Sequence, residues 1–156
     1  MDTLNMAGHL IRRLHQQATL IFAQRTQAAG FDLTPVQFAA LDAVHAHPGV
    51  DQASIAELIA YDRATMGGVI DRLVQKGWVY RVVSERDRRA RELSLTAEGT
   101  RIHTALLPVV QSLQSDILSP LEEADQASFL NLARRIVHLL DVNTGANSST
   151  RTDGAD

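Results

Sequence analysis

The sequence predicts a mainly α, α+β fold in which one β-hairpin follows four helices and precedes two more. Apolar residues recur at the helical period along six segments, and most of these segments begin or end at a capping residue. The pattern changes to the alternation of strands only within residues 78–95. Aromatic residues make up 4% of the chain, and its apolar content is mostly Leu, Ile, Val and Ala, as in helix-rich proteins.

The first helix is predicted over residues 9–27, where apolar side chains share one face. Gly30 can then close this helix in the left-handed conformation. The second helix begins at a capping box formed by Thr34 and Gln37 and ends at residues 47–49.

A short third helix is predicted over residues 52–60. Asp62 caps the fourth helix, which ends at Gly77. The buried stripe of the fourth helix consists of Val69, Ile70, Leu73 and Val74.

A hairpin follows, with strands at residues 78–83 and 91–95 and a polar tip at 84–90. Although the chain has a net charge of −3, the segment from Tyr61 to Arg91 holds eight cations and four anions. All but one of the 15 basic residues are Arg, the side chain suited to bidentate contacts with phosphates and base edges. A basic segment in an acidic chain predicts a surface for a polyanion, and the alternative is a solvated charged hairpin.

Thr96 caps a fifth helix that runs to about Leu118, and Ser119 with Glu122 form a capping box that opens the sixth. Residues 143–156 are predicted to be a disordered tail. The first helix and the last two are too apolar on one face for a single layer. We therefore expect them to pack against a second copy of the chain.

The composition excludes several classes of protein. With no Cys, the chain has no disulfide scaffold, thiolate nucleophile or Cys-ligated zinc site. It shows no secretory leader and no membrane-length apolar run, so we expect a soluble cytoplasmic protein without a membrane partner. Esterase, phosphate-loop and zinc-protease motifs are absent, and the sequence predicts neither an enzyme nor a cofactor.

Two short helices followed by a basic hairpin form the winged helix-turn-helix arrangement, whose second helix enters the major groove of DNA. The predicted contacts with DNA are Ser54, Arg63, Ala64, Thr65, Met66, Arg72, Arg86, Arg88 and Arg89. Ser54 is expected to bind phosphate at a helix N-terminus, and Asp87 to hold one wing arginine in place.

Gly67 and Gly68 interrupt the helix that should enter the groove. Each destabilises a helix by roughly 1 kcal/mol. A close approach of the helix backbone to DNA explains this cost, because glycine has no Cβ. The alternative is a close crossing of two helices in the core.

The sequence resembles the multiple antibiotic resistance regulator (MarR) family of bacterial transcription factors from about Leu10 to Asp141. The most specific match is residues 84–89, Ser-Glu-Arg-Asp-Arg-Arg, continued by residues 93–99; residues 33–38, 55–58 and 71–78 match upstream. The resemblance implies a homodimer on a pseudo-palindromic operator, with half-sites about 10 bp apart. It also implies a repressor that a small aromatic carboxylate or phenol releases. Asp62 and the Gly67-Gly68 pair depart from the family pattern, so no operator sequence carries over.

The implied organisation is an N-terminal dimerisation helix (1–32), a winged helix-turn-helix lobe (33–96), C-terminal dimerisation helices (97–142) and the tail (143–156). Family effectors sit between the dimerisation helices and the lobe. We expect Arg13 to bind an effector carboxylate. The other expected effector residues are His9, Arg12, His15 and Gln16. The alternative for this cluster is a solvated surface or intersubunit salt bridges.

His45 and His47, with Asp42 and Asp51 nearby, permit a metal-responsive regulator as an alternative. Their loose spacing and their position at a helix end favour no metal site. A helical protein-interaction module is a further alternative, which the arginine-rich hairpin tip disfavours. His103 and His138 are expected to serve packing or hydrogen bonding between helices.

Overall fold

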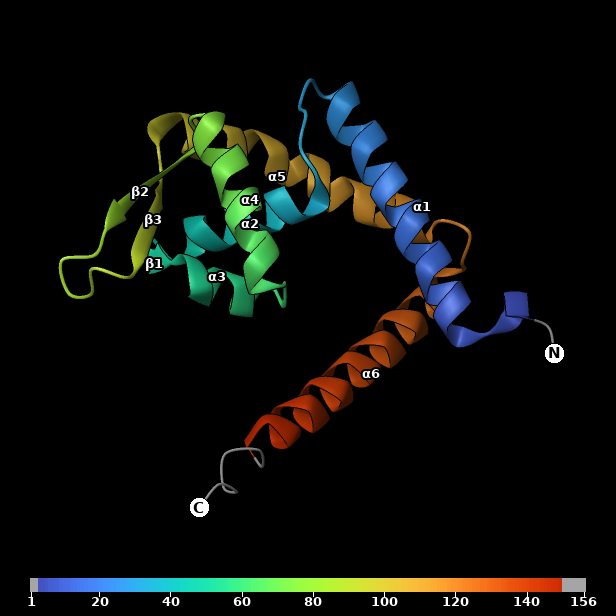
Figure 1. The fold of residues 1–156 in the computed structure, drawn as a ribbon. Coiled ribbons are helices and arrows are strands. Elements are labelled where there is room, and N and C mark those ends of the chain that lie inside the picture. The colour runs from blue at the N-terminus through green and yellow to red at the C-terminus, as the bar shows by residue number, and fades with distance from the viewer. Residues whose placement is uncertain (1–2, 150–156) are drawn as a thin grey trace, which may run out of the picture. The chain divides into compact units, whose positions relative to one another are not determined.

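The computed structural model describes residues 3–149, with side chains described as far as Asp141 (Figure 1). In chain order the elements are η1 (Thr3–Asn5), α1 (Ala7–Ala28), α2 (Pro35–Ala46), β1 (Val50–Asp51), α3 (Gln52–Leu58), α4 (Arg63–Gln75), β2 (Val79–Val83), β3 (Arg91–Leu95), α5 (Ala97–Leu118) and α6 (Glu123–Ser149). The predicted fold class is confirmed. The described chain forms two compact units that divide between Ile117 and Leu118.

Local sequence accounts for several helix ends. The Thr34 hydroxyl accepts a hydrogen bond from the Gln37 backbone N–H at 3.3 Å, and the Gln37 side chain accepts one from the Thr34 N–H at 3.1 Å. This is the predicted capping box of α2. Gly30 and Gly77 have φ angles of 86° and 71°, and these left-handed residues follow α1 and α4 as predicted.

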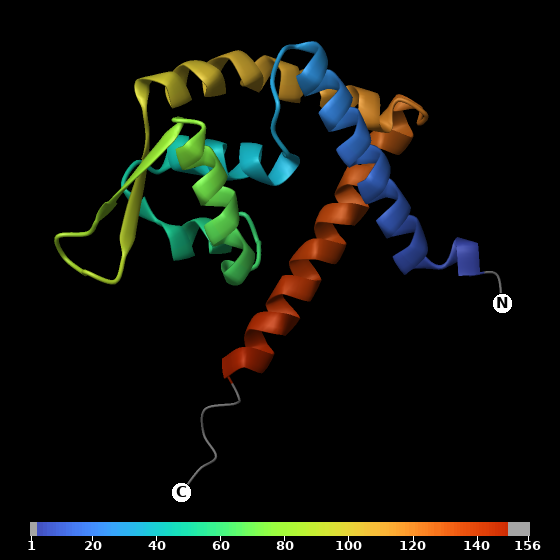
Figure 2. The same ribbon diagram turned by 45° about the horizontal axis from the view of Figure 1, so that its top comes forward.

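The sheet has three antiparallel strands in the order β1-β3-β2. Strand β1 was not predicted, because it contains only two residues and exists through its partner: Val50 pairs with Leu93 and Asp51 with Glu92. The Gly49 N–H extends this pairing by donating to the Leu93 carbonyl at 2.8 Å. Figures 1 and 2 show β2 and β3 extending as a hairpin beyond the helices of the lobe.

One core joins the lobe to parts of α1 and α5. Leu41, Ile55, Ile70 and Leu106, which come from α2, α3, α4 and α5, are fully buried. Phe22 of α1 joins them, and its ring lies 6.4 Å from that of Phe38. Aromatic and aliphatic side chains of both flanking helices therefore complete the core of the lobe within one compact unit, and the functional division at residues 32/33 and 96/97 stays a prediction.

Helix α6 differs from its prediction at both ends. It begins at Glu123, and the Glu122 carbonyl accepts the first N–H bonds of the helix, so the turn containing Pro120 precedes it rather than opening it. At the other end α6 continues to Ser149 through residues 143–149 of the expected tail. Residues 150–156 lie outside the described part of the chain. None of the described helices is long and apolar enough to cross a membrane.

Candidate nucleic-acid interface

Helix α4 has one buried and one exposed face. Its buried residues are Met66, Val69, Ile70 and Leu73. The opposite face exposes Ala64, Thr65, Gly68 and Arg72, which the helical period brings together. Three predicted DNA contacts therefore share this face. The prediction that Met66 contacts DNA is wrong. Its side chain is fully buried, because its position in the helix places it on the same face as Ile70 and Leu73.

A carboxylate caps the N-terminus of α4. Asp62 accepts hydrogen bonds from the Thr65 backbone N–H at 2.8 Å and from the Thr65 hydroxyl at 2.7 Å. These bonds, the one from the hydroxyl first, hold the pKa of Asp62 below its ordinary value. The Thr65 hydroxyl proton is thereby engaged by Asp62, although the residue is exposed.

Helix α3 repeats the arrangement. The Ser54 hydroxyl donates to Asp51 at 2.6 Å and the Ser54 N–H donates at 3.0 Å, and these bonds lower the pKa of Asp51. An anionic side chain thus occupies the N-terminus of α3 in this structure, and contact between Ser54 and a phosphate stays a prediction. An acidic residue three positions before Ser or Thr is a signal in the sequence that identifies both caps.

Arg63, the first residue of α4, forms an ion pair with Glu57 of α3. Both side chains are about two-thirds exposed, at 66% and 64%. Arg81 of β2 pairs similarly with Asp71 of α4. Lys76 Nζ also lies 4.0 Å from Asp32 Oδ2, so carboxylates pair with three of the eight cations of the basic segment. The sequence offers no signal for either arginine pair, since each forms across a turn or between a helix and a strand.

The two glycines of α4 are not required by packing within the chain. A Cβ added at Gly68 would meet nothing within 4 Å, and one at Gly67 would make an ordinary contact of 3.6 Å with the Gln52 side chain. The alternative explanation, a close crossing of helices, is therefore wrong. Gly68 is exposed and places no side chain on this face of α4.

The hairpin tip, residues 84–90, is organised by two side chains. The buried Ser84 hydroxyl accepts the backbone N–H groups of Arg86 and Asp87 at 3.2 and 3.3 Å. The Asp87 carboxylate accepts the Arg89 backbone N–H at 2.9 Å. Asp87 therefore orients the backbone of the tip rather than a guanidinium. Ser84 was missed from the sequence as a member of this site.

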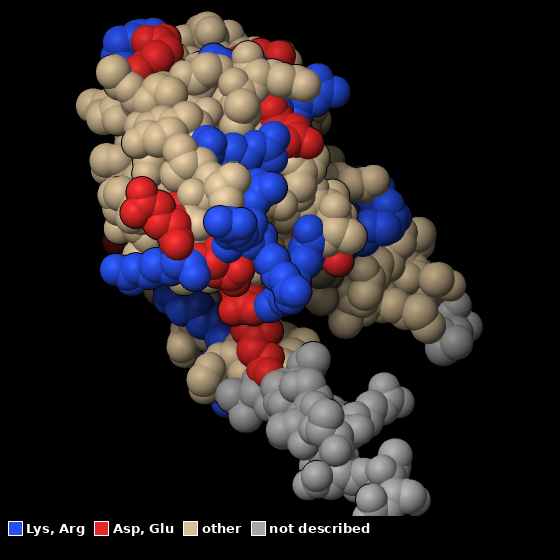
Figure 3. Space-filling model, turned by 60° about the vertical axis from the view of Figure 1, so that its left-hand side comes forward, with Lys and Arg blue, Asp and Glu red and all other residues tan. Residues whose placement is uncertain are grey.

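The guanidinium groups of the tip point into solvent. Arg86, Arg88 and Arg89 are exposed, and within the described chain none of them forms an ion pair with a carboxylate. Figure 3 shows Lys and Arg side chains gathered on the face that carries the hairpin, with Asp and Glu side chains between them. The tip thus presents three arginines without an ion pair within four consecutive residues.

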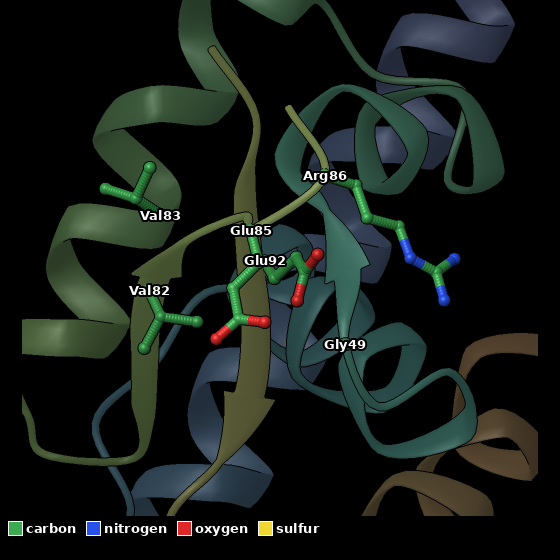
Figure 4. A pocket seen from close by; sticks show the side chains of 6 residues that line it. All are labelled: Gly49, Val82, Val83, Glu85, Arg86 and Glu92. Atoms are coloured by element: carbon green, nitrogen blue, oxygen red, sulfur yellow. The ribbon is translucent and has the colours of Figure 1, made fainter. Parts of the chain in front are cut away.

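A hollow of about 560 Å³ lies beside the tip end of strands β2 and β3, and its lining includes Glu85, Arg86 and Glu92. Figure 4 shows the two carboxylates on the same side of the hairpin, with the Arg86 side chain pointing away from them. The two carboxylates disfavour the binding of a phosphate inside this hollow. The direction of Arg86 separates it from them.

The predicted effector residues lie on the N-terminal half of α1. Arg12, Arg13, His15 and Gln16 are exposed, and Arg12 Nη2 lies 3.3 Å from His9 Nδ1. Besides the hollow at the hairpin, one lies between α1 and α5 and another, of about 440 Å³, is lined from α1, α2 and α4. None of these three is lined by the predicted effector residues. In a single chain their side chains face solvent.

The histidine of α5 is buried in the core. His103 Nε2 lies 2.7 Å from Asp42 Oδ1, and the His103 ring stacks on His45 with centroids 4.1 Å apart. His103 thus packs and hydrogen-bonds between helices, as predicted. No group of three or more His, Cys, Asp or Glu residues suited to a metal ion occurs in the described part of the chain.

Comparisons with known proteins identify the relatives of this chain. The sequence profile of the MarR family matches residues 31–90. The transcriptional regulator HosA of Escherichia coli O157:H7 is 33% identical over 138 residues, which cover 88% of this chain and 99% of HosA.

Two examples illustrate the solved structures that resemble this fold. One is the PcaV transcriptional regulator of Streptomyces coelicolor with its natural ligand, at a TM-score of 0.79 and 34% identity, covering 88% of this chain and 96% of that one. The other is BpsR of Bordetella bronchiseptica, whose DNA binding is regulated by 6-hydroxynicotinic acid. It aligns at a TM-score of 0.80 and 26% identity, with the same coverage of both chains.

Replacing Asp51 with Ala is expected to lower the free energy of unfolding by about 1 kcal/mol at neutral pH, because α3 loses its cap. The pKa of Asp51 in the folded protein lies below its ordinary value of 3.8. The advantage of the wild type is therefore present above that pH and is lost as the pH falls through the lowered pKa. Urea unfolding of both proteins across this range measures the difference.

The control is Asp51→Asn, which keeps a capping oxygen but does not titrate. Its smaller loss of stability should not depend on the ionisation of residue 51. Equal unfolding free energies for the wild type and Asp51→Ala at neutral pH would contradict the capping role.

Proposed function

The chain belongs to the MarR family of transcriptional regulators, and from this we propose that it acts as a homodimeric repressor that binds a pseudo-palindromic operator and releases it on binding a small aromatic acid. The observation that carries the proposal is the combination of exposed, unneutralised arginines on the hairpin tip with the exposed polar face of α4. An acidic protein that concentrates guanidinium groups on a narrow hairpin has a surface suited to the phosphates and minor groove of DNA.

In this proposal the exposed face of α4 lies in the major groove. Ala64, Thr65 and Gly68 face the base edges, and Arg72, two turns beyond Thr65 on the same face, contacts a phosphate. Arg86, Arg88 and Arg89 contact the adjacent minor groove. Ser84 and Asp87 hold the backbone from which these arginines extend.

Exposed apolar side chains support the homodimer. In helix α1 the side chains of Leu10, Ile11 and Leu14 are 46–60% exposed to solvent. These three residues give the helix an exposed apolar surface. Helix α6 exposes Phe129, Leu130, Leu132, Ile136, Val137, Leu139 and Leu140. Contiguous apolar surface of this kind marks an interaction site. A second copy of the chain would bury these side chains and place two lobes on successive turns of the duplex.

The effector proposal rests on chemistry and on relatives. PcaV was solved with its natural ligand, and 6-hydroxynicotinic acid, an aromatic carboxylic acid, regulates DNA binding by BpsR. The exposed Arg13 offers a partner for such a carboxylate, and the dimer partner would supply the rest of the cavity. An effector that prefers a lobe spacing unsuited to the two grooves lowers operator affinity by the coupling free energy, typically about 1–3 kcal/mol.

The test of the proposed function is titration of the protein onto a labelled duplex from the region upstream of its own gene, at several salt concentrations. Replacing Arg86, Arg88 and Arg89 together with Ala is expected to weaken binding strongly. It should also flatten the dependence of log affinity on log salt by about 0.9 for each phosphate that the variant no longer neutralises.

The matched control replaces the same three arginines with Lys, which keeps the charge and should preserve the salt dependence better than Ala does. Unchanged duplex affinity in the triple Ala variant would exclude the hairpin from DNA binding.

The glycine of the exposed face permits a second test. Gly68→Ala is expected to raise the free energy of unfolding by about 0.5–1 kcal/mol, because Ala favours a helix and its Cβ meets nothing within the chain. Duplex affinity should fall by about tenfold, because the methyl group would separate α4 from the base edges.

Gly67→Ala is the matched control for Gly68→Ala. It makes the same change one residue away, where the new Cβ faces the Gln52 side chain. Gly67→Ala should raise the free energy of unfolding about as much as Gly68→Ala does, and it should lower duplex affinity less. Equal affinities for the wild type and Gly68→Ala would show that α4 does not approach DNA at this position.

Arg13→Ala tests the effector site. Operator affinity should stay within about threefold, roughly 0.7 kcal/mol. The concentration of aromatic acid that releases half of the duplex should rise about tenfold or more, because the effector carboxylate no longer has this charged hydrogen-bond donor. A panel of aromatic acids identifies the effector, and Arg101→Ala serves as the control for removal of an exposed helical arginine. An unchanged dose response would remove Arg13 from the site.

A further inference from the structure

The turn that leads into α4 is surrounded by negative charge. Glu57 lies near the end of α3, Asp62 caps α4, and Arg63 is the first residue of α4. This turn therefore carries two carboxylates and one guanidinium, and Glu57 holds that guanidinium in an ion pair. The hairpin tip has the opposite balance, since its residues 84–90 include three arginines and two acidic side chains.

An ion pair as exposed as Glu57–Arg63 contributes only about 0–1 kcal/mol to the stability of the folded protein in water. Contact with DNA changes its environment, because docking expels water and strengthens the remaining interactions. A carboxylate at such a contact either remains paired with its arginine or faces the phosphates unpaired. The second state is costly, so the pair should persist in the complex.

The geometry of the pair leaves donors free. In the structure Nη2 of Arg63 donates to Oε1 of Glu57. A guanidinium has five N–H donors, so those not used by Glu57 remain available for a two-point contact with a guanine edge. Holding the guanidinium beforehand also reduces the rotamer entropy that binding would otherwise cost.

We propose that Glu57 is a positioning residue, which orients the Arg63 guanidinium toward a base edge. The charge of Glu57 also disfavours a phosphate at the same place. The ion pair, and not the arginine alone, therefore sets base discrimination at the start of α4. This inference rests on the proposed DNA-binding function. It divides the surface into a hairpin tip that contributes affinity for any duplex and a helix start that contributes selectivity.

The experiment first selects preferred duplexes from a pool with a randomised core, using the full-length wild-type protein. Dissociation constants are then measured by fluorescence anisotropy, at fixed salt, for the selected duplex and for a scrambled duplex of the same length and composition. The discrimination ratio is the constant for the scrambled duplex divided by that for the selected one. The variants are Glu57→Gln, Arg63→Gln, the double variant, and Glu98→Gln as the control.

Glu98→Gln removes the same charge from another exposed carboxylate paired with an arginine, Arg101 of α5. Glu57→Gln is expected to bind the scrambled duplex at least as tightly as the wild type and to lower the discrimination ratio about fivefold or more. In the Arg63→Gln background the further change Glu57→Gln should leave the ratio nearly unchanged, since the residue that it positions is gone. Thermal unfolding of each variant checks that the fold is retained.

Three results would overturn the inference. Equal changes in the dissociation constants of Glu57→Gln and Glu98→Gln, on both duplexes, would mean that only the net charge of the protein affects binding. A higher discrimination ratio for Glu57→Gln would mean that Glu57 competes with DNA for Arg63. Additive effects of the two changes would mean that the residues act separately. If the wild type selects no sequence but binds all duplexes, the inference fails while DNA binding stands; if it binds no duplex, the proposed function itself fails.

Discussion

The burial of one face of α4 is the constraint on which the rest of the surface depends. Met66, Ile70 and Leu73 enter a core that α2, α3 and α5 share. Because a helix repeats every 3.6 residues, this choice also decides which residues face outward. Thr65, Gly68 and Arg72 are exposed together for that reason. Any tilt of α4 that improved its contact with a ligand would have to disturb this core, so the exposed face is presented rigidly.

Charge is distributed over this surface by structural needs as well as by recognition. Asp51 and Asp62 serve as helix caps and Asp71 pairs with Arg81, so carboxylates stand close to the helices of the lobe. The arginines of the hairpin tip form no ion pair within the described chain, and Asp87, one of the two acidic residues of the tip, accepts a backbone N–H instead. The positive potential of an acidic protein is thereby concentrated where backbone hydrogen bonds, and not ion pairs, hold the loop.

The exposed apolar side chains of α1 and α6 lie outside the surface proposed to contact DNA. The second half of α1 completes the core of the lobe through Phe22, whereas its first half exposes Leu10 and Leu14 together with the charged side chains near Arg13. A single helix thus connects the lobe with the surface proposed for dimerisation.

Several features follow from the sequence alone. Periodicity and caps located the helices, Gly30 and Gly77 marked two helix ends, and the residues 84–89 identified the hairpin and the family. These features are local, since each depends on residues within a few positions of one another. They sufficed for the fold class and for most of the exposed face of α4.

Other features were decided only by tertiary structure. Strand β1 exists because Leu93 is available to pair with Val50, and Met66 is buried because other helices cover that side of α4. The Glu57–Arg63 pair and the contact of His103 with Asp42 join side chains from different elements. No local pattern encodes such contacts, because they depend on how elements pack after each has formed. The sequence alone determined which elements form; packing determined which side chains they bring together and which they leave exposed.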